Sequence, residues 1–492
     1  MENTKAESSG SFLSALGLFD GVMLVSGVMI GSGIFITSAD IARTVGGAGW
    51  MLVVWLIGGF MTITAAVSYG ELSAMYPKAG GQYVYLREAY NPLIAFLYGW
   101  AFFAVIETGT IAAVAVAFAK YTAYILPQLG EDKILFSMQG FSVSVAQVVA
   151  ILIIVILSYI NSKGIRNGKI IQGVFTCAKI LALALLIGFG FFLGARSGIW
   201  SENWAHAWQG FHYDELTGSA AGYTQAIASH GMELIALVGV AMVGSLFSSD
   251  AWNSVTFIAA EMKNPRRNVG LSLFLGTLLV TIIYVLCNLV YMSVLSMHDI
   301  AFAKADRVAA TASYYIFGAS GAVIIAVMIM VSTFGCNNGL ILSGARVYYT
   351  MAQDGLFFKR TARLNKHGVP AYGLWIQCIW ASVLCLSGRY NDLLNYIIFV
   401  VLIFYVLTIV GIYILRKKYP DAKRPYRAAG YPVLPAIYIV LAFVICLALL
   451  VYRPTYTWPG LIIVLIGIPL YFLFLRSGSG KALSLPETGE DD

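Results

Sequence analysis

The chain has 492 residues, of which 59% are hydrophobic and only 11% are charged. Soluble domains carry roughly 25% charged residues, so this composition excludes an ordinary soluble protein and indicates a membrane protein. The formal net charge of +7 does not indicate a nucleic-acid partner, because the basic residues gather in loops where membrane topology explains them.

Twelve apolar segments are long enough to cross a bilayer, for which a helix needs about 20 residues. We therefore predict an all-α polytopic membrane protein with 12 transmembrane helices and the lipid bilayer as its surroundings. In chain order the segments are 14–37, 49–74, 92–126, 143–161, 171–194, 233–260, 270–296, 320–352, 371–387, 393–415, 431–452 and 457–475.

The positive charges predict the orientation. Most of the 31 Lys and Arg residues lie in the two tails and in the alternate loops that begin after the second segment. Loops rich in Lys and Arg stay on the cytoplasmic side, so we expect cytoplasmic tails at 1–13 and 476–492 and a multi-pass protein of the cell (cytoplasmic) membrane. The first segment lacks a convincing cleavage site and is expected to remain in the protein.

The first segment contains a glycine-rich run, from Gly27 through Gly31, Ser32 and Gly33. Each glycine weakens a helix by about 1 kcal/mol relative to alanine. Inside a bilayer, backbone without helical hydrogen bonds survives only where it lines a cavity or is held by other protein, so the run indicates a ligand site. A packing face of small residues is the alternative interpretation.

A second interruption is expected in the sixth segment, between Val243 and Asn253. Its Ser and Asp side chains compete with helical hydrogen bonds. An inverted repeat of five segments would place this interruption opposite the first one. We therefore expect repeats at 14–194 and 233–415, forming a ten-helix transport core at 14–415, and peripheral helices at 431–475.

Two interrupted helices suit a zwitterion. The half-helix after Gly31 would direct the N–H groups of Ser32 and Gly33 at a carboxylate, because a helix N-terminus favours negative charge. Carbonyls of the preceding half-helices would accept hydrogen bonds from an ammonium group; these carbonyls belong to Met29, Ile30, Phe247 and Ser248. An α-amino acid carries both charges on one carbon.

Several motifs strengthen this interpretation when they are taken in order. They are 31–35 (GSGIF), 76–90 (YPKAGGQYVYLREAY), 175–179 (FTCAK), 252–253 (WN) and 264–268 (NPRRN). With these motifs, residues 12–475 resemble the amino acid, polyamine and organocation superfamily, and within it the L-type amino-acid transporter branch, with more likeness to its bacterial members.

The resemblance implies a leucine-transporter-type fold with a 5+5 inverted repeat and broken helices 1 and 6. It implies an antiporter that works by alternating access, often without sodium. It assigns the substrate carboxylate to Ser32 and Gly33, an aromatic gate to Phe247, and a link between helix 6 and closure to Asn253. The ammonium would meet carbonyls of Met29, Phe247 and Ser248.

Lys179 lies too deep in the fifth segment to be a simple topological anchor. The resemblance implies that its ammonium takes the space of a sodium ion and bonds carbonyls near the first interruption, which favours sodium independence. A lysine that extends to the cytoplasmic surface is the alternative.

Two carboxylates bear on the choice of substrate. Asp250 stands where a relative that accepts basic and neutral amino acids also has aspartate, although it could instead cap the second half of the sixth helix. Glu107 of the third segment could face the same cavity and allow proton coupling, or could be protonated and hydrogen-bonded between helices. Glu71 and Glu261, near the cytoplasmic ends of their segments, are expected to pair with Lys or Arg.

The sequence therefore predicts a sodium-independent exchanger of neutral and possibly basic L-amino acids. A proton-coupled importer, a transporter of cationic amino acids or amines, and a non-transporting sensor are the alternatives. No enzyme, cofactor, metal or nucleic-acid partner is expected. No disulfide-linked heavy subunit is expected either, because the loop at 127–141 contains no cysteine. The tryptophans of the external segment 195–232 fit an interfacial helix or an outer cover.

Overall fold

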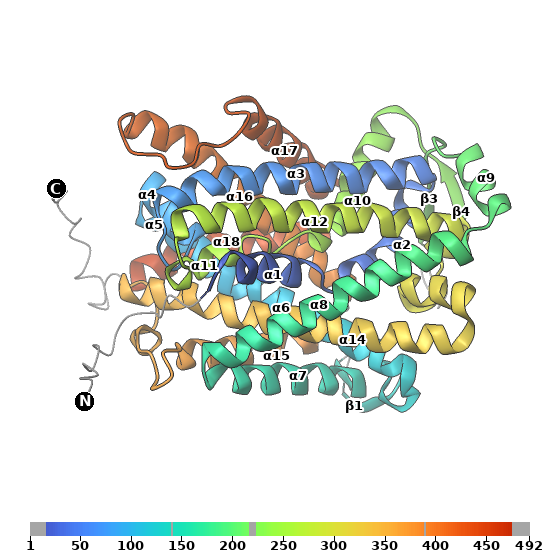
Figure 1. Ribbon diagram of the computed structural model, residues 1–492, viewed down its shortest axis with the longest axis horizontal. Helices are drawn as coiled ribbons and strands as arrows, with labels where there is room; N and C mark the ends of the chain where they lie inside the picture. Colours follow the sequence, from blue (N-terminus) through green and yellow to red (C-terminus); the bar gives the residue numbers. More distant parts are fainter. Residues whose placement is uncertain (1–15, 139–140, 216–222, 388–389, 475–492) are drawn as a thin grey trace.

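The computed structural model describes residues 16–138, 141–215, 223–387 and 390–474, and its architecture is almost entirely helical (Figure 1). The expected terminal tails lie outside the described residues. The long elements are α3 (Ala48–Met75), α5 (Pro92–Ala101) continued by a π-helical turn (Phe102–Ile106) and α6 (Glu107–Ile125), α7 (Val145–Ser162), α8 (Ile165–Phe189), α10 (Gly231–Ser248), α12 (Pro265–Val294), α14 (Val308–Gln353), α16 (Tyr390–Lys418), α17 (Val433–Tyr452) and α18 (Pro454–Phe474).

Shorter elements complete the chain. They are α1 (Leu18–Met29), α2 (Gly33–Val45), α4 (Gln82–Ala89), α9 (Ser197–Ala205), α11 (Ser254–Phe257), α13 (Met297–Ala301), α15 (Ala371–Ser387), β1 (Ile134–Met138), β2 (Phe141–Ser144), β3 (Phe211–Glu215) and β4 (Tyr223–Ala228). The strands form two antiparallel hairpins, β1 with β2 and β3 with β4.

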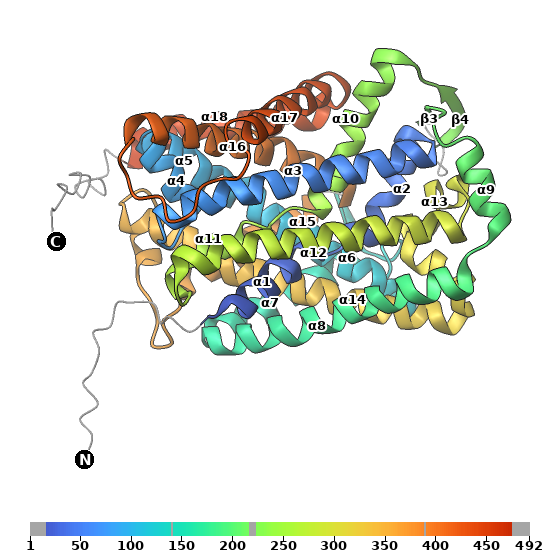
Figure 2. The same cartoon turned by 45° about the horizontal axis from the view of Figure 1, so that its top comes forward.

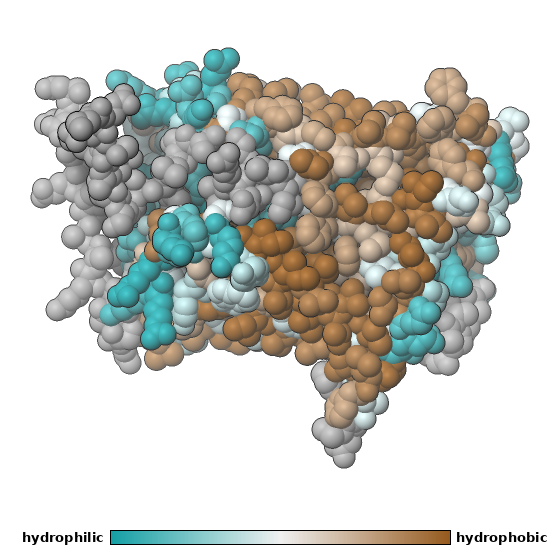
Figure 3. Space-filling view, turned by 60° about the horizontal axis from the view of Figure 1, so that its bottom comes forward, coloured by the Kyte–Doolittle hydropathy of each residue, from teal (hydrophilic) through white to brown (hydrophobic). Residues whose placement is uncertain are grey.

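Among the described residues, ten helices are long and apolar enough to cross a membrane, and α1 with α2 makes an eleventh if the bent pair is one span. Each of the twelve predicted segments is mostly helical over its described residues. However, the ninth forms only α15, a helix of 17 residues, which is shorter than the roughly 20 residues of a typical span. A broad hydrophobic surface separates hydrophilic ends in Figure 3, which fits a multi-pass membrane protein.

Two interruptions occur where the sequence predicts them. The first break, residues 30–32, separates α1 from α2, and the two helices are bent by 41°. The second break, residues 249–253, separates α10 from α11. The second half of the sixth segment is shorter than expected, because α11 has only four residues and is followed by a 3-10 turn at Ala259–Glu261.

The two breaks lie inside the helical bundle (Figure 2), where residues 24–39 and 239–259 are buried. Helix α1 packs against α8, α12 and α14, whereas α2 packs mainly against α10. Helices α17 and α18 pack on α16 at the outside of the bundle. The carbonyls at the end of α1 therefore face side chains from several long helices.

The segment after α8 covers one end of the molecule. Helix α9 and the hairpin of β3 and β4 lie beyond the end of α2 in both cartoons (Figures 1 and 2). Trp208 stacks edge-on against Trp50 with ring centroids 5.6 Å apart, and its carbonyl accepts a hydrogen bond from the Trp50 indole. The segment thus forms a short helix and also covers this end of the molecule.

Candidate functional site

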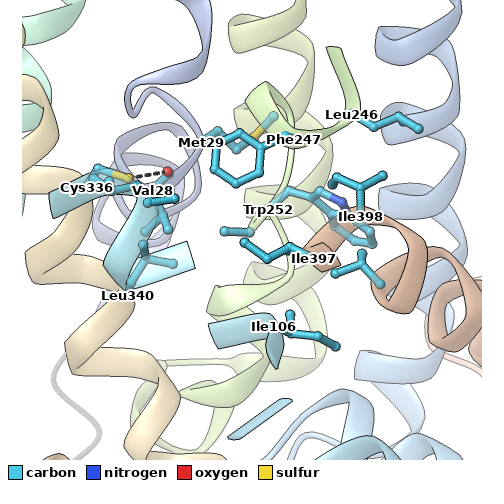
Figure 4. Close-up of a cluster of buried hydrophobic side chains, with 14 of the residues drawn as sticks. Val28, Met29, Ile106, Leu246, Phe247, Trp252, Cys336, Leu340, Ile397 and Ile398 are labelled. Atoms are coloured by element: carbon cyan, nitrogen blue, oxygen red, sulfur yellow. Dashed lines mark hydrogen bonds between the residues drawn. The ribbon is translucent and has the colours of Figure 1, made fainter. Parts of the chain in front are cut away.

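The first break is held together by its carbonyl groups. The last four carbonyls of a helix have no partner within that helix and need donors from elsewhere. In α1 these donors are side chains from three other helices. The Gly27 carbonyl receives Lys179 of α8, and the Val28 carbonyl receives the Cys336 thiol of α14 at 2.9 Å (Figure 4).

Lys179 is buried, with 1% of its surface exposed. Its ammonium donates to the carbonyls of Gly27 at 2.5 Å, Ile30 at 2.8 Å and Ser332 at 3.2 Å. The contact with carbonyls at the first break is therefore present, and the alternative in which this lysine extends to the surface is wrong. A cation at this position also complements the negative end of the α1 dipole.

The Ile30 carbonyl belongs to this lysine cluster. It accepts hydrogen bonds from Lys179 and, at 3.0 Å, from the Ser332 hydroxyl. Next to it, Gly31 lies against α14, where a Cβ atom on the glycine would approach Cys336 Sγ to 2.8 Å. The Ile30 carbonyl, which the sequence analysis assigned to a substrate ammonium, thus already accepts two hydrogen bonds from protein donors.

The two breaks meet at one phenol. The Tyr284 hydroxyl of α12 is placed to donate to the Met29 carbonyl at 2.7 Å and to the Ser248 carbonyl at 2.9 Å. Because a hydroxyl has a single proton, it can donate to only one of these acceptors at a time. The carbonyls of Met29 and Ser248 were expected to bind the substrate ammonium together. Both therefore lie around a common point, the Tyr284 hydroxyl.

The half-helices that follow and precede the breaks are also in direct contact. Gly33 begins α2, with Ser32 as the residue before its first turn. A Cβ atom on Gly33 would lie 2.6 Å from the Ser248 Cα, so only glycine permits this approach. The Thr37 hydroxyl bonds the Ser248 hydroxyl at 3.0 Å and so ties α2 to α10.

Phe247 belongs to the buried cluster drawn in Figure 4, together with Met29 and Trp252. Its carbonyl accepts the Asp250 amide at 3.1 Å, within the turn that ends α10. Ala251 follows with a left-handed φ of 62°. Such a conformation is uncommon for alanine and is typical of functional sites.

Asp250 is 7% exposed, and its Oδ1 accepts the Tyr405 hydroxyl of α16 at 2.7 Å. The interpretation of Asp250 as a helix cap is wrong, because Asn253 holds the N-cap position of α11. The five-residue second break moves the start of the helix beyond the reach of the aspartate, whose carboxylate points to α16 instead.

Asn253 is joined to the first residue of α4. Its side chain donates to Gln82 Oε1 at 3.0 Å, and Gln82 donates to the Thr408 hydroxyl at 3.0 Å. Gly81 brings the preceding loop against α11, since a Cβ atom there would meet Thr256 Oγ1 at 2.2 Å. Helix α11, the second half of the sixth segment, is therefore attached to the motif at 76–90 through Gly81.

Glu107 and Asp250 line the same small cavity, as the sequence suggested for Glu107. This cavity has room for about one water molecule. Its polar lining comes from Gln82, Tyr98, Glu107, Thr110, Asp250, Asn253 and Tyr405. A second cavity of similar size touches the other side of Asp250 and reaches Thr62 and Tyr438.

The structure thus brings together every residue that the sequence placed at the site, around the two breaks and the adjoining cavity. Sequence reasoning missed Tyr284, Cys336, Ser332 and Tyr405, which lie in long apolar helices without a local signal. Gln82 was inside a quoted motif but had no assigned role. Among the described residues, no group of three His, Cys, Asp or Glu side chains could hold a metal ion.

Ion pairs of two buried glutamates lie at the end of the molecule where α4 and α11 lie. Glu261 pairs with Arg346 at 3.1 Å, with both side chains almost fully buried. Glu71 pairs with Arg416 at 2.7 Å and Arg424 at 3.5 Å. The expectation that these two glutamates pair with basic residues is confirmed.

The sequence matches the amino acid permease family over residues 16–474. It is 27% identical to human b(0,+)-type amino acid transporter 1 over 97% of this chain and 92% of that protein. It is 28% identical to human large neutral amino acids transporter small subunit 2, over 93% of this chain and 80% of the relative. Mouse Asc-type amino acid transporter 1 is also 28% identical, over 94% and 82% of the two chains. With two broken helices facing each other and a family match that covers nearly the whole sequence, the chain belongs to the amino acid permease family.

Proposed function

We propose that the protein is a sodium-independent amino-acid exchanger that carries neutral and basic L-amino acids by alternating access. The observation that carries the proposal is the common point between the Met29 and Ser248 carbonyls, where Tyr284 now donates. A substrate ammonium has three donors and no acceptor. It can therefore satisfy these carbonyls together, which a single phenol proton cannot.

The carboxylate end of the substrate is assigned to Ser32 and Gly33 at the start of α2. Helix N-termini present amide N–H groups and positive dipole character, which suit a carboxylate. The cavity beside Asp250 has room for only about one water molecule. An amino acid needs a wider space, so binding requires the half-helices to move, as alternating access provides.

Lys179 supports the absence of a sodium requirement. Its ammonium already fills a cluster of three carbonyl oxygens from Gly27, Ile30 and Ser332. Carbonyl oxygens are ligands for hard cations, and a sodium ion at this cluster would have to compete with a fixed positive charge. We therefore expect identical exchange in sodium and in choline buffers.

Substrate breadth rests on Asp250. Its carboxylate lies between the two small cavities, within reach of the side chain of a bound amino acid. The names of two relatives point the same way, since one is a b(0,+)-type transporter and the other a large neutral amino acids transporter. A carboxylate at the side-chain end favours basic substrates without excluding neutral ones.

The twelve-helix topology is part of the proposal. The two breaks lie in the first and sixth apolar segments, which supports inverted repeats at 14–194 and 233–415 within a core at 14–415. Helices α17 and α18, within 431–475, are then peripheral. We further propose that both termini face the cytoplasm, that the protein resides in the cell membrane, and that it works without a disulfide-linked heavy subunit.

The decisive experiment is counterflow in proteoliposomes that contain the purified full-length protein. Liposomes loaded with unlabelled L-leucine should accumulate labelled L-leucine, and empty liposomes should not. The assay is repeated with sodium or choline outside, and with arginine, lysine, alanine and leucine as competitors. Specific binding of leucine without any uptake would identify a sensor and refute transport.

The role of Asp250 is tested in the same assay with Asp250→Asn. We expect arginine to lose about tenfold in apparent affinity while leucine changes by less than about twofold, because a charge-assisted pair contributes about 1.5–3 kcal/mol. Asp132→Asn is the matched control, since Asp132 is exposed in the loop before β1. An unchanged ratio of arginine to leucine affinity in Asp250→Asn would remove the selectivity role.

A further inference from the structure

Glu107 carries a buried oxygen that the described protein leaves without a partner. The residue is 3% exposed, and its Oε1 has no hydrogen bond within the described part of the chain. It is the first residue of α6, directly after the π-helical turn at Phe102–Ile106. Such turns inside α-helices are frequent at functional sites.

The side chain of Gln377 from α15 lies against the same glycine of α14 as this oxygen. Gln377 donates its Nε2 to the Ile341 carbonyl at 3.3 Å, which fixes the amide so that Oε1 points the other way. Gln377 Oε1 is also buried and without a partner among the described residues. A Cβ atom on Gly344 of α14 would lie 2.7 Å from both Glu107 Oε1 and Gln377 Oε1, so both oxygens lie against the same glycine.

Both buried oxygens are acceptors, and each lacks a donor hydrogen among the described residues. A proton on Glu107 would supply it, since a carboxylic acid donates one O–H bond. The surroundings favour the neutral acid as well, because an unpaired buried charge is expensive in a membrane protein. No Lys or Arg lines the cavity that Glu107 shares with Asp250.

Asp250 differs from Glu107 in its partners. The Tyr405 hydroxyl donates to Asp250 at 2.7 Å and so stabilises the carboxylate. Glu107 instead faces a second acidic group across the cavity. The titratable groups around Glu107 are Asp250, Tyr98 of α5, Tyr405 of α16, and Tyr348 and Cys336 of α14.

We propose that Glu107 holds a proton, donated to Gln377 Oε1, while a neutral amino acid is bound, and that the cationic side chain of a basic amino acid displaces this proton. The O–H bond of the acid breaks, the proton passes to water, and the guanidinium or ammonium group pairs with the Glu107 carboxylate. One positive charge thus replaces another in the cavity. The inference rests on the proposed function and explains how a single site could accept both substrate classes.

Proton release on binding tests the proposal directly. The full-length protein, purified in detergent, is titrated in weakly buffered solution with L-arginine or L-leucine while a pH indicator is read. We expect about one proton released for each arginine bound and none for leucine. In proteoliposomes, the apparent KM for arginine should fall as the pH rises, by at most about tenfold per pH unit because one proton is exchanged.

Two variants control the assignment. Glu107→Gln should release no proton with arginine, and its arginine KM should not depend on pH. Glu202→Gln should behave as the unmodified protein, because Glu202 is exposed in α9. If Glu107→Gln fails to fold, infrared spectra of the unmodified protein serve instead, with a carboxylic-acid carbonyl band that is lost when arginine binds.

The outcomes separate the two claims. Arginine binding without proton release, an arginine KM independent of pH, or no arginine binding at all would each overturn the proton exchange at Glu107. A failure of leucine counterflow would refute the transporter proposal instead. The proton measurement does not depend on transport, so it can be read in either case.

Discussion

Replacement of Lys179 by alanine removes the donor that holds the end of α1. The ammonium bonds three carbonyls, and hydrogen bonds from charged groups contribute about 1.5–3 kcal/mol each. The Ile30 carbonyl keeps its bond from Ser332, so the loss falls mainly on Gly27. We expect the first break to lose about 3 kcal/mol of stabilisation in the arrangement seen here. This corresponds to a factor of about 100 in apparent substrate affinity.

The assay is the concentration dependence of labelled leucine uptake into proteoliposomes, corrected for the amount of reconstituted protein. Lys179→Met should resemble Lys179→Ala, because it keeps the length of the side chain and loses only the charge. Lys163→Ala is the matched control, since Lys163 is exposed after α7. A KM for Lys179→Ala within about twofold of the unmodified protein would refute this account of the first break.

Three further substitutions probe the site and its closure. Tyr284→Phe removes the neutral hydrogen bond that competes with the substrate ammonium for the carbonyls of the two breaks, so the leucine KM should fall by about fivefold to tenfold in uptake assays. An unchanged KM would contradict this competition. Gly33→Ala places a Cβ atom 2.6 Å from the Ser248 Cα and should abolish uptake. Gly198→Ala is the control, because a Cβ atom there meets nothing within 4 Å and uptake should not change. Normal uptake by Gly33→Ala would disprove the contact. Arg346→Leu leaves Glu261 buried without its partner and should destabilise the protein by about 3–5 kcal/mol, seen as a lower Tm in detergent; an unaltered Tm would argue against a structural pair.

The positions of both breaks could be predicted because their residues are poor helix formers. The run through Gly31 and Gly33 weakens a helix by composition, and the residues around Ser248 compete for its hydrogen bonds. Lys179 could be found because a charge inside an apolar segment is rare and needs a reason. These features are local, so the sequence displays them directly.

The partners of these residues could not be predicted in the same way. Tyr284 and Tyr405 look like ordinary aromatic residues of apolar helices, and only the packing of α12 and α16 directs their hydroxyls at the breaks. The cap interpretation of Asp250 failed for a related reason. Sequence composition indicates that a helix is interrupted, but it does not give the number of residues that remain unwound.

The two halves of the sixth segment, α10 and α11, are attached to different parts of the protein. Helix α10 is fixed to α2, where Gly33 lies directly on Ser248, whereas α11 is fixed to the loop at Gly81. The five residues between them thus join two separate attachments. Bulk added at Gly33 would disturb the contact of α10 with α2, and bulk added at Gly81 would disturb the contact of α11 with the loop, so each attachment can be perturbed on its own.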